Sequence, residues 1–218
     1  MADSKTFYVS NMEVYTGKQP EGPYKINNSS DEVVKRLITP ISGTGRNVTI
    51  ENWFMSYPLA LDLISQHNLT VVGTVRKNKR ELPPNISNVK NRKENSSIFG
   101  FQGRITVVSY TPKKGKNVIM FSTMHHDAKI NIETGEKAKP EIITFYNSTK
   151  SGVDTVDQLC ATYNTSRNSR RWPLTIFFRL LDVAGINARI IYYFNAKENI
   201  KRRVFLKKLG LALISDAV

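Results

Sequence analysis

Short runs of β-branched residues alternate with helical patterns along the first third of the chain. Runs of this kind predict strands over residues 6–11, 46–50 and 70–75, with residues 14–15 pairing with the first after a tight turn. Apolar residues at helical spacing predict helices over 32–39, where Pro40 ends the helix, and over 56–64. This order of elements favours an α/β fold with a partly parallel sheet.

The pattern changes after residue 75. Residues 76–97 are polar, and two alternating segments, 104–110 and 117–123, predict a β-hairpin with a basic tip. The last third predicts three helices, over residues 153–161, 174–194 and 197–213. Because apolar residues cover most faces of 174–194, we expect that helix to pack on several sides.

These patterns predict an α/β protein with a mixed sheet, flanking helices and a helical C-terminal third. The predicted domain organisation has four parts: a first part of the core (1–76), an inserted β subdomain that contains the hairpin (77–140), the rest of the core (141–195) and a basic C-terminal helix (196–218). A length of 218 residues fits one domain with an insertion. No stretch approaches the roughly 20 apolar residues of a membrane span, so we predict no membrane association.

Charge narrows the class of partner. The chain has 32 Lys and Arg against 18 Asp and Glu, a net charge of +14, and the surplus begins at Arg76. A neutral segment followed by a strongly basic one favours a polyanion partner, and nucleic acid is the most plausible. RNA is disfavoured because no signature of an RNA-binding module is present. The single cysteine, Cys160, excludes a disulfide framework or a zinc knuckle built from this chain alone.

Several carboxylates lie where strands end or helices begin. Asp3 precedes the first predicted strand, Glu51 follows the second, and Asp154 and Asp157 share one face of a predicted helix. Carboxylates in such places are the oxygen ligands that a pair of Mg²⁺ ions needs for phosphoryl displacement. The competing interpretation is that they are capping or surface carboxylates. Spacing alone favours that competing interpretation.

Five segments resemble the piggyBac family of DDE transposases, in the family's order and over almost the whole chain. They are 2–8 (ADSKTFY), 44–58 (TGRNVTIENWFMSYP), 73–80 (GTVRKNKR), 145–160 (FYNSTKSGVDTVDQLC) and 166–173 (SRNSRRWP). The resemblance implies a ribonuclease-H-like catalytic core interrupted by an inserted β subdomain. It also implies metal-dependent DNA strand cleavage and strand transfer.

The resemblance also implies roles for the carboxylates. Asp3 takes the first acidic position, Glu51 the second and Asp154 the third, with Asp157 as an additional aspartate. It implies two Mg²⁺ or Mn²⁺ ions bound by these residues, double-stranded DNA with TTAA targets as the partner, and a nuclear location. It further implies a homodimer formed through regions that are largely missing from this chain.

Two departures from the family pattern affect the expected activity. The family has Asp where this chain has Glu51, and the extra methylene displaces the carboxylate by on the order of 1 Å, which can cost on the order of 10²-fold in rate. The strand that should carry Asp3 is also truncated. We therefore expect weak or no strand transfer by this chain in isolation. The alternative function is a domesticated, non-catalytic DNA-binding or chromatin-associated protein that keeps the fold.

Two basic clusters are candidate DNA contacts. They comprise Arg76, Lys77, Lys79 and Arg80 after the third predicted strand, and Arg167, Arg170, Arg171 and Trp172 before the long helix. The arginines suit backbone phosphate. Trp172 could stack on an unpaired base or fill the core, and the usual burial of tryptophan favours the core. The basic residues of 201–208 fit DNA contact, a nuclear import signal or a solvated helix face.

Overall fold

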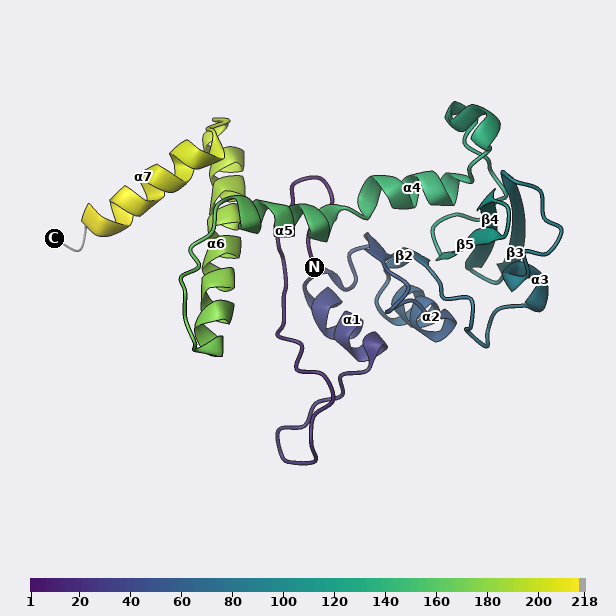
Figure 1. The fold of residues 1–218 in the computed structure, drawn as a ribbon, viewed down its shortest axis with the longest axis horizontal. Coiled ribbons are helices and arrows are strands. Elements are labelled where there is room, and N and C mark those ends of the chain that lie inside the picture. The colour runs from purple at the N-terminus through teal and green to yellow at the C-terminus, as the bar shows by residue number, and fades with distance from the viewer. Residues whose placement is uncertain (216–218) are drawn as a thin grey trace. The chain divides into compact units, whose positions relative to one another are not determined.

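The computed structural model describes residues 1–215, which divide into two compact units. The sheet unit comprises residues 13–150, and the helical unit comprises residues 1–12 together with residues 151–215 (Figure 1). Each unit is described by itself below. Their limits differ from the four predicted segments, which remain predictions about domain organisation.

The sheet unit is built around one five-stranded sheet. Its strands are β1 (Asn47–Ile50), β2 (Thr70–Thr74), β3 (Ser96–Gln102), β4 (Ile105–Lys113) and β5 (Lys116–Ser122). Its helices are α1 (Ser30–Ile38), η1 (Thr39–Ile41), α2 (Tyr57–Gln66), α3 (Pro84–Ser87), η2 (Ile132–Lys137) and α4 (Glu141–Thr149). The strand order is β1-β2-β5-β4-β3, in which β1 and β2 are parallel and the other pairs antiparallel. The strands of the predicted hairpin therefore continue the sheet that β1 and β2 begin.

Helices α2 and α4 cover opposite faces of this sheet (Figure 1). Residues of α4 join a buried cluster with Val72 of β2 and Met120 of β5. On the other face, Tyr57 of α2 meets the ring of Phe121, edge to face. Successive residues of a strand point to opposite faces of a sheet. Met120 therefore packs on the α4 side of the sheet and Phe121 on the α2 side.

The parallel pair β1 and β2 approach each other closely at their carboxyl ends. Ile50, the last residue of β1, pairs with Gly73. A Cβ atom on Gly73 would lie 2.4 Å from the backbone oxygen of Ile50, a distance that real Cβ contacts do not show. Only glycine therefore fits this position without separating the two strands.

The helical unit contains α5 (Gly152–Thr162), α6 (Trp172–Ala196) and α7 (Arg202–Ser215). Val156 and Cys160 of α5 pack against Val183 and Ile186 of α6 in a buried cluster. The N-terminal segment joins this cluster and is fixed to α6 through Asn187. The Asn187 side chain accepts a hydrogen bond from the Val9 amide at 2.9 Å and donates one to the Val9 carbonyl at 2.8 Å.

Most predicted elements are confirmed, and the exceptions have identifiable causes. Residues 6–11 and 14–15 do not form strands, because residues 2 and 9 make only an isolated bridge around a tight turn. Strand β3 and helix α4 were not predicted. The former has glycine and serine where β-branched residues would signal a strand, and the latter lies in a motif whose helix was expected only from residue 153. Helix α7 begins five residues later than expected.

The prediction that the long helix packs on several sides is wrong for the part of the chain described. The buried residues of α6 are Asp182, Val183 and Ile186, on the side that meets α5. Many of its apolar residues are exposed, including Phe177, Leu180, Leu181, Ile191 and Phe194. An all-round apolar pattern shows what a helix can bury but does not show what covers it. Within residues 1–215, no helix is both long and apolar enough to cross a membrane.

We predict that Gly73→Ala destabilises the protein by about 1–3 kcal/mol or more, because the added methyl group meets a backbone atom that cannot rotate away. Urea unfolding followed by circular dichroism measures the change. Gly22→Ala is the matched control, since its Cβ would meet open space, and should change stability by less than about 0.5 kcal/mol. Equal stability of the two variants would contradict the proposed close approach of β1 and β2.

Candidate catalytic and DNA-binding residues

Glu51 follows directly on β1, where the chain turns sharply. The Glu51 carbonyl accepts hydrogen bonds from the amides of Phe54 and Met55, both at 3.1 Å, and Met55 is fully buried. This turn fixes the backbone of Glu51 and leaves its side chain exposed. Within residues 1–215, the Glu51 carboxylate makes no hydrogen bond or ion pair, so its oxygens are available to a ligand.

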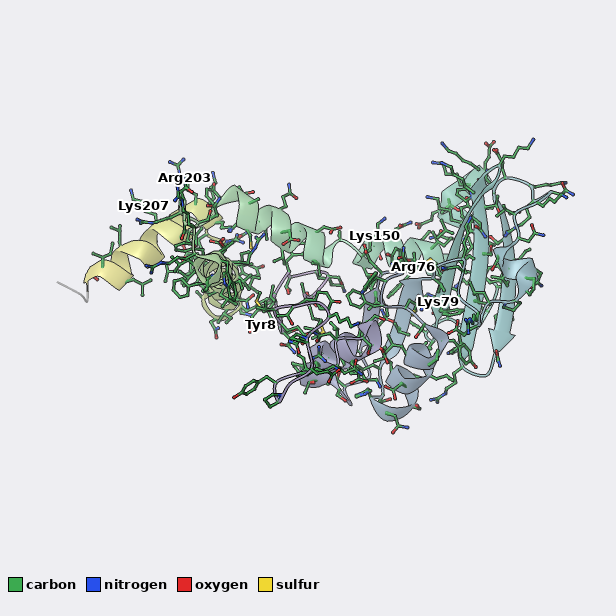
Figure 2. All side chains as sticks on the ribbon, turned by 60° about the horizontal axis from the view of Figure 1, so that its bottom comes forward. Tyr8, Arg76, Lys79, Lys150, Arg203 and Lys207 are labelled. Atoms are coloured by element: carbon green, nitrogen blue, oxygen red, sulfur yellow. The ribbon has the colours of Figure 1, made fainter. Side chains whose placement is uncertain are left out.

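The basic residues after β2 lie at the same edge of the sheet as Glu51. Parallel strands place their carboxyl ends together, so Arg76 emerges beside the turn that follows β1. Arg76 Nε donates a hydrogen bond to Asn52 Oδ1 at 3.2 Å, and its guanidinium carbon lies 4.9 Å from the centroid of the Trp53 ring. Figure 2 shows Arg76 and Lys79 in this part of the sheet unit. Lys77 and Arg80 are also exposed, and Lys79 is half-buried.

Asp3 lies in the tight turn of the N-terminal segment. Its Oδ1 accepts hydrogen bonds from the Thr6 hydroxyl at 2.6 Å, the Thr6 amide at 2.6 Å and the Lys5 amide at 3.1 Å. These donors favour the charged form, and the Thr6 hydroxyl has the largest effect, so the pKa of Asp3 lies below its ordinary value. The Asp3 carboxylate is therefore ionised at neutral pH and held in one orientation.

Asp154 lies in the first turn of α5, close to the N-terminal segment. Gly152 of the same turn is buried, and a Cβ there would lie 3.5 Å from the Ala2 carbonyl oxygen and 3.7 Å from that of Asp3. The structure thus brings the Asp3 and Asp154 segments together in the helical unit. The Asp154 carboxylate is exposed and has no hydrogen bond or ion pair to any residue the structure describes. Asp157, one turn later, instead lies 3.7 Å from an Arg179 nitrogen.

The four predicted metal ligands are divided between the two units. Asp3, Asp154 and Asp157 belong to the helical unit and Glu51 to the sheet unit. Across residues 1–215, no group of three or more His, Cys, Asp or Glu is arranged to hold a metal ion. Glu51 and Asp154 each have the ligand type that a hard divalent cation prefers. Both offer exposed carboxylate oxygens without a protein partner among the described residues.

The predicted arginine loop is anchored by a residue that the sequence did not single out. Asp182 Oδ1, buried in α6, accepts hydrogen bonds from the Thr165 amide at 2.8 Å and the Thr165 hydroxyl at 3.0 Å. An aspartate is rarely buried without such partners. The signal in the sequence was an acidic residue within a largely apolar helical segment. The bonds hold the start of the loop whose exposed arginines are Arg167, Arg170 and Arg171.

Trp172 does not fill the core, so the burial favoured from sequence is wrong. It begins α6, and 73% of the residue is exposed. Pro173 in the first turn sets this helix start, which places the indole in solvent beside the arginine loop. An exposed indole next to three arginines suits stacking on a base. On α7, the labelled Arg203 and Lys207 are also exposed (Figure 2).

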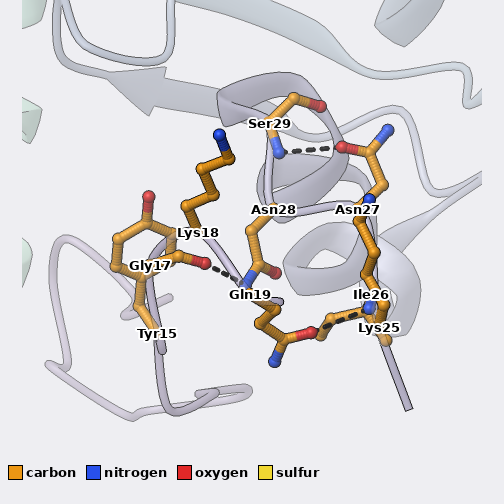
Figure 3. A pocket seen from close by; sticks show the side chains of 9 residues that line it. All are labelled: Tyr15, Gly17, Lys18, Gln19, Lys25, Ile26, Asn27, Asn28 and Ser29. Atoms are coloured by element: carbon orange, nitrogen blue, oxygen red, sulfur yellow. Dashed lines mark hydrogen bonds between the residues drawn. The ribbon is translucent and has the colours of Figure 1, made fainter. Parts of the chain in front are cut away.

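A cavity of about 530 Å³ lies elsewhere in the sheet unit, in the loop that precedes α1 (Figure 3). Its lining comes from residues between Tyr15 and Ser29, chiefly amide and lysine side chains. None of the predicted catalytic or DNA-binding residues lines it. The predicted residues therefore lie outside this cavity, and nearly all of them are exposed at the surface of their own unit.

Comparison with known proteins identifies similar chains. Residues 1–189 match the family model described as Transposase IS4, a DDE family. The chain is also similar to the piggyBac transposase in the cryo-EM structure of its synaptic complex with hairpin DNA, with a TM-score of 0.88 and 38% sequence identity. That similarity covers 97% of this chain and 44% of the other, so this chain spans less than half the length of the transposase it matches.

We predict that Thr6→Val raises the pKa of Asp3 toward its ordinary value, because the variant loses the hydroxyl donor and keeps the shape. A carboxyl-detected NMR titration measures this pKa. Since the pKa is lowered in the folded protein, its stabilisation is present above the ordinary pKa near 4 and is lost as pH falls through the lowered value. The stability difference between wild type and variant should therefore shrink in acid. An unchanged Asp3 pKa would contradict the role of Thr6.

We predict that Asp182→Ala lowers the free energy of unfolding by about 1–3 kcal/mol, because it leaves the Thr165 donors unpaired. Asp182→Asn keeps an acceptor oxygen and should lose less. Urea unfolding measures both, and hydrogen exchange of the Thr165 amide reports the loop itself, with faster exchange expected in the alanine variant. Wild-type stability and wild-type exchange of the Thr165 amide in Asp182→Ala would show that Asp182 does not anchor the loop.

Proposed function

Since this chain belongs to the Transposase IS4 family, we propose that it cuts and joins DNA as the core of a piggyBac-like transposase. The resemblance predicted from the five motifs is confirmed. The ribonuclease-H-like mixed α/β fold is confirmed as well, by the match to the piggyBac transposase structure. The substrates and partners proposed below extend beyond that match, because the chain spans only part of the matched protein.

The catalytic proposal rests on the family match and on two exposed carboxylates that have no protein partner among the described residues, one at a strand end of the sheet unit and one in the first turn of a helix of the helical unit. Glu51 and Asp154 would hold divalent metal, Mg²⁺ or Mn²⁺, with Asp3 and Asp157 completing the set by resemblance. Bound there, the cations would activate the attacking oxygen and stabilise the leaving oxygen of an in-line displacement at phosphorus. The Thr6 donors keep Asp3 ionised and oriented for this role.

The proposed partner is double-stranded DNA. The exposed basic residues after β2 and before α6 suit phosphate contacts, and the net charge of +14 would attract a polyanion over a distance. The structure of the matched transposase is that of a synaptic complex with hairpin DNA. TTAA targets, a homodimer and two bound ions follow from resemblance. The basic residues between 201 and 208 support a nuclear location.

The alternative, a non-catalytic DNA-binding protein with the same fold, is not favoured by either comparison, since both matches are to transposases. It would share the basic surface and lack metal-dependent cleavage. Cleavage and binding must therefore be measured separately on the same protein.

We predict weak Mn²⁺-dependent nicking of a labelled terminal-repeat duplex by the 218-residue chain. Asp154→Asn and Glu51→Gln should abolish the nicking, because each removes a ligand charge. Glu51→Asp should raise the rate by up to about 10²-fold, because it restores the shorter side chain of the family. Glu133→Gln, which changes an exposed carboxylate on η2, is the matched control and should leave the rate unchanged.

DNA binding without metal is measured in parallel by fluorescence anisotropy, and affinity should fall steeply with salt. Salt-dependent binding with no nicking in wild type or Glu51→Asp would favour the non-catalytic alternative. Nicking that persists in Asp154→Asn would exclude these carboxylates as the catalytic set. A flat salt response would contradict the proposal that DNA is the partner.

A further inference from the structure

The turn after β1 carries an exposed aromatic residue that the proposed chemistry does not use. Trp53 lies two residues after Glu51, and 54% of the residue is exposed. Met55 of the same turn inserts into the core at 0% exposure. The indole of Trp53 is instead held at the surface, at the sheet edge that also carries Glu51 and Arg76.

Arg76 pairs with this indole in a fixed geometry. Its guanidinium carbon lies 4.9 Å from the ring centroid, and its Nε donates to Asn52 Oδ1 at 3.2 Å, so two neighbouring residues orient one cation. The terminal nitrogens of Arg76 make no hydrogen bond to any residue in the described range. They are therefore free to donate to a phosphate oxygen while the guanidinium carbon stays close to the ring.

We infer that Trp53 and Arg76 form a stacking platform for an unpaired nucleotide of DNA, with the base on the exposed Trp53 indole and the phosphate on the Arg76 nitrogens. This inference rests on the proposed function and adds to it a recognition site for nucleotides outside the duplex. Flat aromatic and guanidinium surfaces bind unpaired bases of any sequence, because every base has a π face. Bases inside a duplex are already stacked and cannot use such a platform.

The position beside Glu51 gives the platform a function. Trp53 and the proposed metal ligand Glu51 lie in the same turn, two residues apart in sequence, so the platform would fix the DNA strand near the phosphodiester that reacts. Trp53 and Arg76 are then positioning residues for the strand rather than catalytic groups. A competing explanation is that the pair only braces the turn after β1. The two explanations differ in their response to DNA that has unpaired bases.

The experiment uses the full chain carrying Trp172→Phe, because the chain has only two tryptophans and this variant leaves Trp53 as the sole indole. Its fluorescence is titrated with a blunt duplex and with the same duplex bearing a short unpaired overhang. We expect overhang DNA to quench Trp53 emission strongly and the blunt duplex to quench it little. Circular dichroism and urea unfolding confirm that each variant is folded.

Affinity for the two DNAs is then measured in three variants. Trp53→Ala should weaken binding of overhang DNA roughly fivefold to hundredfold, and should change blunt-duplex binding less than about twofold. Arg76→Lys keeps the charge but loses the planar guanidinium group, so it should lower overhang affinity with the salt dependence unchanged. Tyr24→Ala removes a 90% exposed aromatic residue from the loop before α1 and is the control expected to have no effect.

Equal quenching by both DNAs, or equal loss of affinity for both in Trp53→Ala, would overturn the platform and leave duplex binding intact. Wild-type overhang affinity in Trp53→Ala would overturn it as well. If neither DNA binds, the proposed function fails together with this inference. If the blunt duplex binds but the overhang gives no additional effect, only the platform fails.

Discussion

The close parallel pairing of β1 with β2 is the constraint on which the candidate site depends. It is possible because Gly73 leaves room for the Ile50 carbonyl, which any side chain at that position would displace. Parallel strands end at the same edge, so the pairing delivers a carboxylate, Glu51, and a cation, Arg76, to one place from segments about 25 residues apart in sequence. The turn after β1 is then fixed by two backbone hydrogen bonds to Glu51 and by the buried Met55.

In the helical unit, hydrogen bonds from side chains orient acidic residues and hold a loop in place. The Thr6 hydroxyl orients the Asp3 carboxylate, and the buried Asp182 carboxylate holds Thr165 at the start of the arginine loop. Asp154 is left without a protein partner within the described residues, whereas Asp157 lies near Arg179. The exposed oxygens of Asp154 therefore have no competing protein ligand among the described residues.

Sequence patterns predicted the elements with strong local signals. Strands β1 and β2, the β4–β5 hairpin and helices α1, α2, α5 and α6 are confirmed, because β-branched runs and helical spacing reflect burial directly. Positions decided by tertiary contacts were not predictable. Trp172 was expected in the core and is exposed, and β3 has too many small residues to signal a strand. The roles of Asp182 and Trp53 depend on partners distant in sequence or on exposure, which a one-dimensional pattern does not contain.

The most direct test of the central claim, that Glu51 and Asp154 serve as metal ligands, is paramagnetic broadening of backbone NMR signals by Mn²⁺ in the DNA-bound chain. The account predicts selective broadening of amides in both the turn after Glu51 and the first turn of α5, and loss of both effects when either carboxylate is replaced by its amide. Broadening confined to one of the two segments, or spread evenly over the acidic surface, would contradict it.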